Sequence, residues 1–168
     1  MIQVDADALK KQFMVDIDVE VRDANPTLVK LFYGRLRELD RVEVEASGHS
    51  EMAAIWWSYR RSHYCKVGLV NGKVAAIWGV GGSLLGGTGL AWLLTTPEME
   101  KVATSTIVQI GRSEVASMMA LYPTLENNIL QRYKKAIRLL MLLGFEIVGF
   151  PVKIGNEHFV KMRASLEG

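Results

Sequence analysis

The chain has 168 residues, of which 49% are hydrophobic and 23% charged, and its formal net charge is +2. These values predict one globular domain, 1–168, with a sizeable core, and the small charge gives no reason to expect a nucleic-acid partner. Cys65 is the only cysteine, which excludes an internal disulfide and fits a reducing compartment. Residues 1–11 combine neither a basic start nor an apolar run, so no signal peptide is expected.

The N-terminal half begins with a strand pattern. Residues 14–22 alternate apolar and charged side chains, which is the period of a half-buried strand. Asn25-Pro26 fits an N-cap followed by proline at the first helical position, and helically spaced leucines predict a helix from there to about Asp40. A second helix is predicted over 50–61. It carries Trp56 and Trp57, so either one of them is exposed as a partner contact or a wide apolar face buries both.

Asn71-Gly72 is the clearest local signal, because it suits the type I′ turn of a hairpin between strands over 64–70 and 73–78. The hairpin opens an uncharged stretch, 74–97, that is long enough to span a bilayer. Its many glycines favour two buried strands, the second over 89–94, joined by a loop, and no membrane span is expected. The glycines also lack the closing residues of a dinucleotide or P-loop motif.

The C-terminal half is predicted to alternate helices and strands. Thr95-Thr96-Pro97-Glu98 fits a capping box that begins a helix, and another helix fills 102–121, with or without a break at Gly111. A stretch with strand-like ends, 122–128, then leads into a basic amphipathic helix that stops at Leu143-Gly144-Phe145. A last hairpin pairs 146–150 with 158–162.

This order of elements resembles the GNAT superfamily, the Gcn5-related N-acetyltransferases, over about 15–163. Within it, the chain is most similar to short, divergent GNAT-like proteins of tailed bacteriophages. The motifs that carry the resemblance are Leu69–Val74, Ser83–Gly89, Trp92–Thr95 and Tyr122–Phe145. The resemblance implies an α/β fold with a mixed, mostly antiparallel sheet of six or seven strands flanked by helices.

The same resemblance implies acetyl-CoA as cofactor and N-acetyl transfer as activity. The alternative is a non-enzymatic phage protein, either a virion or assembly component or a binder of a host protein. It further implies a virion or host protein as partner, and a location in the host cytoplasm or the virion.

Three positions depart from the enzyme pattern and put acetyl transfer in question. Residues 95–101 lack the glycine-rich pyrophosphate loop, and Pro97 removes an N–H donor there while two glutamates add negative charge. Tyr133 stands where many relatives have asparagine. Leu140 replaces the tyrosine that protonates the leaving thiolate, a role that Tyr133 or Tyr122 would have to take.

Site residues follow from the resemblance, each beside a structural alternative. Backbone N–H groups near Leu94, within Leu93–Thr95, would polarise the thioester carbonyl. Asn127, with its neighbours 126 and 128, would orient an amine or a water, or else covers a strand end. Arg132 and Arg138 would lie near the CoA nucleotide, or else belong to a solvated helix face. The three histidines show no metal spacing, so no metal site is expected, and Cys65 is interpreted as a core residue.

Overall fold

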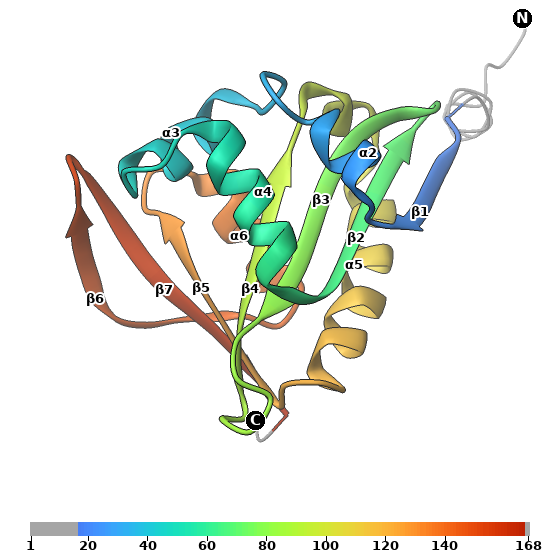
Figure 1. The fold of residues 1–168 in the computed structure, drawn as a ribbon. Helices are drawn as coiled ribbons and strands as arrows, with labels where there is room; N and C mark the ends of the chain where they lie inside the picture. The colour runs from blue at the N-terminus through green and yellow to red at the C-terminus, as the bar shows by residue number, and fades with distance from the viewer. Residues whose placement is uncertain (1–16, 167–168) are drawn as a thin grey trace, which may run out of the picture.

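A computed structural model describes residues 17–166 of the chain (Figure 1). Seven strands form one sheet in the order β1-β2-β3-β4-β5-β7-β6. Neighbouring strands are antiparallel, except that β4 and β5 pair in parallel. The mixed, mostly antiparallel α/β fold is therefore confirmed.

The first helical region differs from the prediction. After β1 (Val19–Asp23), α2 is short (Pro26–Lys30), and a separate helix, α3 (Glu38–Ala46), follows. The prediction of one helix to Asp40 was wrong because the chain turns at Gly34, where φ is 73°. Glu51 Oε1 accepts hydrogen bonds from the N–H groups of Gly34 at 3.0 Å and Leu36 at 3.4 Å and thereby stabilises the turn. Residues 14–16 of the predicted first strand lie outside the described part.

The second helix and the hairpin are confirmed. α4 (Glu51–Arg61) begins at Ser50, whose hydroxyl accepts from the Ala53 N–H at 3.2 Å. β2 (Ser62–Val70) and β3 (Lys73–Gly81) are joined by Asn71 and Gly72, whose φ angles of 51° and 78° are those of a type I′ turn.

The uncharged stretch forms β3 and β4 (Thr88–Thr95) with a loop between them. No helix among the described residues is both long and apolar enough to cross a membrane. The helix predicted at the capping box is a 3₁₀ helix, η1 (Pro97–Lys101). α5 (Thr104–Met119) runs through Gly111 without a break.

The C-terminal order of elements is also confirmed, with β5 (Thr124–Leu130), α6 (Lys134–Leu142), β6 (Glu146–Ile154) and β7 (Glu157–Ser165). Gly144 follows α6 with a φ of 98°, a conformation that favours glycine and ends the helix. β6 and β7 pair as predicted, with an irregularity between Val148 and Val152.

Two buried clusters hold the layers together. One lies beneath α2 and α4, which cover the front of the sheet in Figure 1, and includes Phe32, Ile55 and Ile77. The other joins α5 and α6 to β5 and β7 and includes Tyr122 and Met162. Cys65 packs against the first cluster, and burial raises the pKa of its thiol to about 12, which suits an unreactive core residue. Trp57 is 53% exposed, so α4 does not bury both tryptophans.

Candidate functional site: a cleft between two parallel strands

β4 and β5 pair over three residues and then separate. Thr88, Gly89 and Leu90 are opposite residues 124–126, and the register ends there. Beyond this point the strands diverge toward the top of Figure 1. A cavity of about 420 Å³, here called the cleft, lies at this divergence and is lined from β4, η1, α5, β5, α6 and α3.

The backbone of β4 presents N–H groups to the cleft. The Thr96 N–H donates to the Ala75 carbonyl at 2.9 Å, which extends the ladder between β4 and β3. Because hydrogen-bonded pairs alternate along an antiparallel ladder, the N–H of Leu94 also points at β3. The N–H groups of Leu93 and Thr95 therefore point the other way, toward β5. Leu94 itself is buried in the first cluster, so of the predicted Leu93–Thr95 segment Leu93 and Thr95 line the cleft.

Helix α3 bridges the two strands, since it is hydrogen-bonded to both of them. The Arg37 N–H donates to the Thr95 carbonyl at 2.9 Å, and the Thr95 hydroxyl donates to Asp40 at 2.5 Å. On the opposite strand, the Leu130 N–H donates to Glu43 Oε2 at 3.2 Å. Asp40 and Glu43, the acidic pair, therefore satisfy polar groups of β4 and β5 that the separated strands cannot satisfy with each other.

Both carboxyl groups of the acidic pair have raised pKa values. Burial raises the pKa of Asp40, although the Thr95 hydroxyl and the Arg37 guanidinium at 3.8 Å oppose the shift. Burial also raises the pKa of Glu43 to about 8, and the charge of Asp40 adds to that rise. Two carboxyl groups with raised pKa values in one cleft are typical of a site that handles protons.

Tyr133 completes this cluster. Its hydroxyl donates to Asp40 at 3.2 Å, and burial raises its pKa to about 12, so the phenol keeps its proton at neutral pH. Tyr122, the other candidate proton donor, donates instead to the Gly82 carbonyl at 2.9 Å and does not line the cleft. Among the two candidate tyrosines, the cleft therefore contains Tyr133.

The polar residues of β5 separate in the structure. Asn127 lines the cleft. Glu126 is instead bound by Arg163 at 2.7 Å, and Asn128 is exposed. Of these three neighbours, Asn127 therefore lines the cleft together with Leu93.

The segment 95–101 is a poor anion site, as its sequence suggests. The Thr96 hydroxyl accepts from the Glu98 N–H at 3.3 Å, the Thr96 carbonyl accepts from the Met99 N–H at 3.1 Å, and Pro97 has no donor. The next helix start differs. Ala103, the N-cap of α5, makes no side-chain capping bond, and Thr104 in its first turn lines the cleft.

The two predicted arginines of the CoA region have different surroundings. Arg138 lines the cleft together with Lys135. Arg132 forms an ion pair with Glu157 at 2.8 Å and lies outside the lining. The basic side of the cleft therefore consists of Lys135 and Arg138, opposite the first turn of α5.

The acidic pair was missed in the sequence because α3 was not predicted. A usable signal exists, since Asp40 and Glu43 are three residues apart and so share one face of a helix. Among residues 17–166 no group of His, Cys, Asp and Glu side chains could hold a metal ion.

The fold is similar to solved acetyltransferase structures. An acetyltransferase of the GNAT family from Streptococcus pneumoniae is 14% identical, with 88% of this chain and 99% of that chain covered and a TM-score of 0.59. The aminoglycoside acetyltransferase AAC(6')-Ib in complex with ribostamycin and coenzyme A is 15% identical, with coverage of 89% and 94% and a TM-score of 0.62.

A chimera of the spermidine N-acetyltransferase SpeG from Vibrio cholerae is 13% identical, with coverage of 88% and 95% and a TM-score of 0.61. At these identities the similarity establishes the GNAT fold. No family model and no curated protein matches the sequence.

Proposed function

We propose that the chain is an acyl-CoA-dependent N-acyltransferase, with acetyl-CoA as the simplest donor. The observation that carries this proposal is the open cleft between β4 and β5, which Leu93 of β4 and Asn127 of β5 line together. A slot filled by Leu140, Met141 or Tyr133 would have favoured a non-enzymatic protein. Leu140 and Tyr133 instead line the cleft, and Met141 is 50% exposed and outside it.

The residues of the cleft fit an acyl-CoA, which supplies the acyl group as an activated thioester. The N–H of Leu93 would donate to the thioester carbonyl oxygen and stabilise the negative charge that develops on it. The uncapped first turn of α5 presents N–H groups and the positive end of a helix dipole to a pyrophosphate. Lys135 and Arg138 would neutralise the same phosphates from α6.

The acidic pair and Tyr133 would handle the protons of the transfer. Glu43 is the base that takes a proton from the acceptor ammonium, because its raised pKa of about 8 is close to neutral pH. The amine then attacks the carbonyl carbon and the carbon–sulfur bond breaks. Tyr133 would protonate the departing thiolate in place of the tyrosine that Leu140 replaces, and the second proton that the attacking nitrogen loses would restore the Tyr133 hydroxyl, which donates to Asp40.

Isothermal titration calorimetry with acetyl-CoA tests this proposal, with desulfo-CoA and ADP as controls. Micromolar binding is expected. Arg138→Ala should weaken it at least about tenfold, because the loss of one charge-assisted hydrogen bond costs about 1.5–3 kcal/mol. Arg132→Ala is the matched control on the same segment and should bind normally. A well-folded protein without detectable binding would overturn the enzyme proposal.

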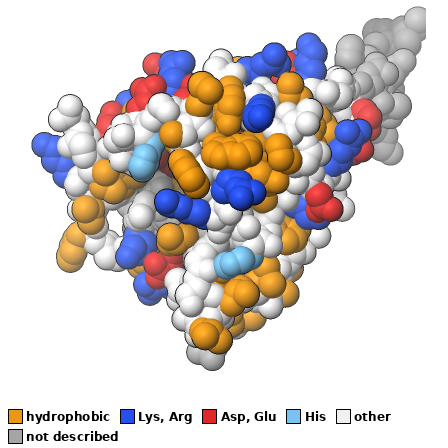
Figure 2. All heavy atoms as spheres, in the orientation of Figure 1, with side chains coloured by type: hydrophobic (Ala, Val, Ile, Leu, Met, Phe, Trp, Pro, Cys, Tyr) orange, Lys and Arg blue, Asp and Glu red, His pale blue; other side chains and the backbone are white. Residues whose placement is uncertain are grey.

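Binding of a protein partner, in the virion or in the host, is the second candidate function. This second proposal includes the origin of the chain in a bacteriophage. Two surfaces support it. The edge strand β6 exposes Phe150 at 91% and Val152 at 60%. Around α2 and α4, Trp57 and Met52 are exposed and Arg61 lies over the Trp57 ring, in the region where Figure 2 shows hydrophobic side chains next to basic ones.

Light scattering and crosslinking separate these surfaces. If the β6 edge binds a partner, Phe150→Asp should abolish a complex that Trp57→Ala leaves intact. The opposite pattern would favour the surface on α4. A protein that stays monomeric and captures no phage or host protein with either surface would remove this second candidate.

A further inference from the structure

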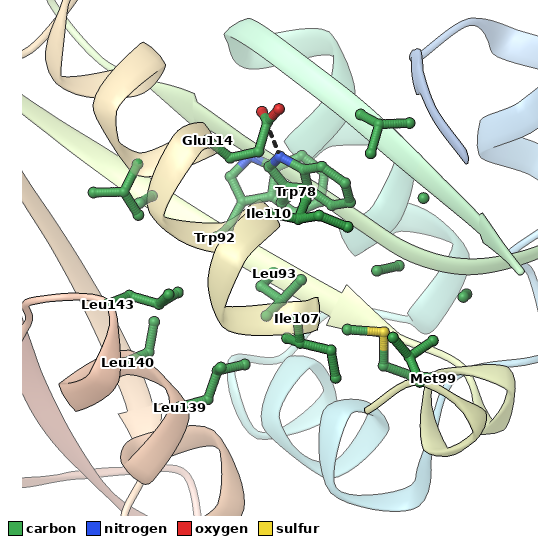
Figure 3. A pocket seen from close by; sticks show the side chains of 18 of the residues that line it. Trp78, Trp92, Leu93, Met99, Ile107, Ile110, Glu114, Leu139, Leu140 and Leu143 are labelled. Carbon is green, nitrogen blue, oxygen red and sulfur yellow. Dashed lines mark hydrogen bonds between the residues drawn. The ribbon is translucent and has the colours of Figure 1, made fainter. Parts of the chain in front are cut away.

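A second cavity, here called the side cavity, lies between α5 and the sheet and has a volume of about 110 Å³. Figure 3 shows it with Trp78 and Trp92 at one end and with Leu139, Leu140 and Leu143 at the other. Glu114 and Asn127 are the polar residues of its lining. The Trp78 indole N–H donates to the Glu114 carboxylate at 3.0 Å and the Tyr64 hydroxyl donates at 2.5 Å, so this carboxylate is already paired.

Small residues on the sheet create this space. Ala76 on β3 is opposite Gly68 on β2, where the Trp78 ring lies 3.2 Å from the position a Cβ atom would take, and Ala91 lies on β4 opposite Val80. All three small residues line the side cavity. The facing side chains of α5, among them Ile107 and Ile110, do not fill the gap that these short side chains leave. An unfilled apolar cavity costs free energy, and an apolar guest that fills it recovers the lost contacts.

The side cavity adjoins the cleft. Seven residues line both, and they come from β4, η1 and its C-cap, α5, β5 and α6. They are Leu93, Met99, Val102, Ile107, Asn127, Leu139 and Leu140. Leu93, whose N–H would bind the thioester carbonyl, thus separates a polar cleft from an apolar space.

We propose that the side cavity binds the hydrocarbon chain of an acyl donor longer than acetyl, so that the preferred donor is a short- to medium-chain acyl-CoA. This inference rests on the proposed function, because it requires the thioester to lie at Leu93. An apolar cavity of about 150 Å³ holds benzene with its six carbon atoms, so the side cavity of about 110 Å³ holds about four further chain carbons. The expected optimum is therefore near hexanoyl.

Calorimetric titration of the full chain with acetyl-, butanoyl-, hexanoyl- and octanoyl-CoA tests the proposal by binding alone. Each buried methylene should tighten binding about fourfold, so butanoyl-CoA should bind about 15-fold more tightly than acetyl-CoA. Hexanoyl-CoA should bind more tightly still. Octanoyl-CoA should gain nothing further, because its last two carbons exceed the space.

Filling the side cavity should remove this gain. Ala76→Leu places a larger side chain in the space and should bring the affinity for hexanoyl-CoA down to that of acetyl-CoA. Ala116→Leu, on the exposed side of α5, makes the same chemical change outside the cavity and should keep the gain. If Ala76→Leu does not fold, Ala91→Val fills part of the same space and should reduce the gain.

The outcomes separate the two proposals. Acetyl-CoA that binds as tightly as the longer esters would overturn the inference and leave the proposed function intact. The same holds if Ala76→Leu retains the full gain, since the chain would then bind elsewhere. If neither CoA nor any of its esters binds, the proposed function fails and the inference fails with it.

Discussion

The two sides of the cleft differ in polarity and in how completely their side chains are packed. At the α3 side, the acidic pair, Thr95 and Tyr133 form a connected polar cluster, and every buried side-chain nitrogen or oxygen atom of the described residues has a partner. At the α5 side, apolar residues border an unfilled space. A buried polar group left unpaired costs about 1–3 kcal/mol, which fixes the hydrogen-bonded arrangement, whereas apolar side chains beside an unfilled space can shift into it. A polar side with fixed hydrogen bonds suits proton transfer, and an apolar side whose side chains can shift suits acyl chains of different lengths.

Loss of the central carboxylate should have the largest effect on stability. Asp40→Ala leaves the Thr95 and Tyr133 hydroxyls without their shared acceptor and removes the ion-pair partner of Arg37, so it should lower the free energy of unfolding by about 3–5 kcal/mol in urea denaturation. Glu38→Ala, at an exposed position of the same helix turn, should cost less than about 1 kcal/mol. Equal losses in the two variants would mean that the polar cluster is not the better-fixed side.

The pH dependence of stability should also originate at the α3 side. Burial raises the pKa of Glu43 from 4.5 to about 8 in the folded chain, so the fold favours the protonated carboxyl. The folded state then binds more protons than the unfolded state between these values, and stability falls as the pH rises from about 4.5 to 8. The raised pKa of Asp40 acts in the same direction.

Glu43→Gln should reduce this slope. The amide cannot ionise, so the free energy of unfolding of the variant should decrease less between pH 5 and 8 than that of the parent chain. The two decreases should differ by at least about 1.4 kcal/mol, which is the equivalent of one pKa unit. Urea denaturation across this range measures the difference. Glu45→Gln, at an exposed position of the same helix, should keep the parent slope. Parallel curves for all three proteins would show that Glu43 ionises normally.

The sequence predicted the sheet well because its signals are local. Asn71-Gly72 determines its own turn, and alternation or glycine spacing identifies strands without their neighbours. The polar side of the cleft depends on distant contacts. α3 escaped prediction because its start depends on Gly34 and on the side chain of Glu51, which lies 17 residues further along the chain. The contact of Glu43 with Leu130 spans 87 residues and leaves no pattern in either segment.

The apolar side was beyond sequence analysis for a different reason. Small residues such as Ala76 and Ala91 are common in buried strands, and their sequence does not reveal that they face an unfilled space. Similarly, Arg132 and Arg138 are equivalent basic residues in the sequence, but only the structure shows that Arg132 forms an ion pair with Glu157. Residue type indicated a basic segment, and packing decided that Arg138, and not Arg132, faces the cleft.

Removal of one hydroxyl from the polar side should have a moderate effect. Tyr133→Phe deletes a single hydrogen bond to Asp40 and should lower the free energy of unfolding by about 1 kcal/mol, measured in urea. Tyr59→Phe is a matched control, because its contact is between the Tyr59 and Trp56 rings, which phenylalanine retains, and it should change stability by less than about 0.5 kcal/mol. A Tyr133→Phe protein as stable as this control would mean that Asp40 does not depend on the phenol.

The smallest change in the free energy of unfolding is expected for a substitution on the apolar side. The sign of this change shows whether the side chains there can shift. A Cβ atom at Gly111 would lie 2.7 Å from Leu143 Cδ2, so the leucine has to move. Leu143 borders the side cavity and can shift into it. Gly111→Ala should therefore keep most of the helix-propensity gain and stabilise the chain by about 0.5 kcal/mol, measured in urea. At Gly89, where a Cβ atom would lie 2.6 Å from both the Tyr122 ring and Val80, the same substitution meets a filled core and should destabilise. If Gly111→Ala destabilises as well, α5 is packed as tightly as the core, and the contrast between the two sides of the cleft fails.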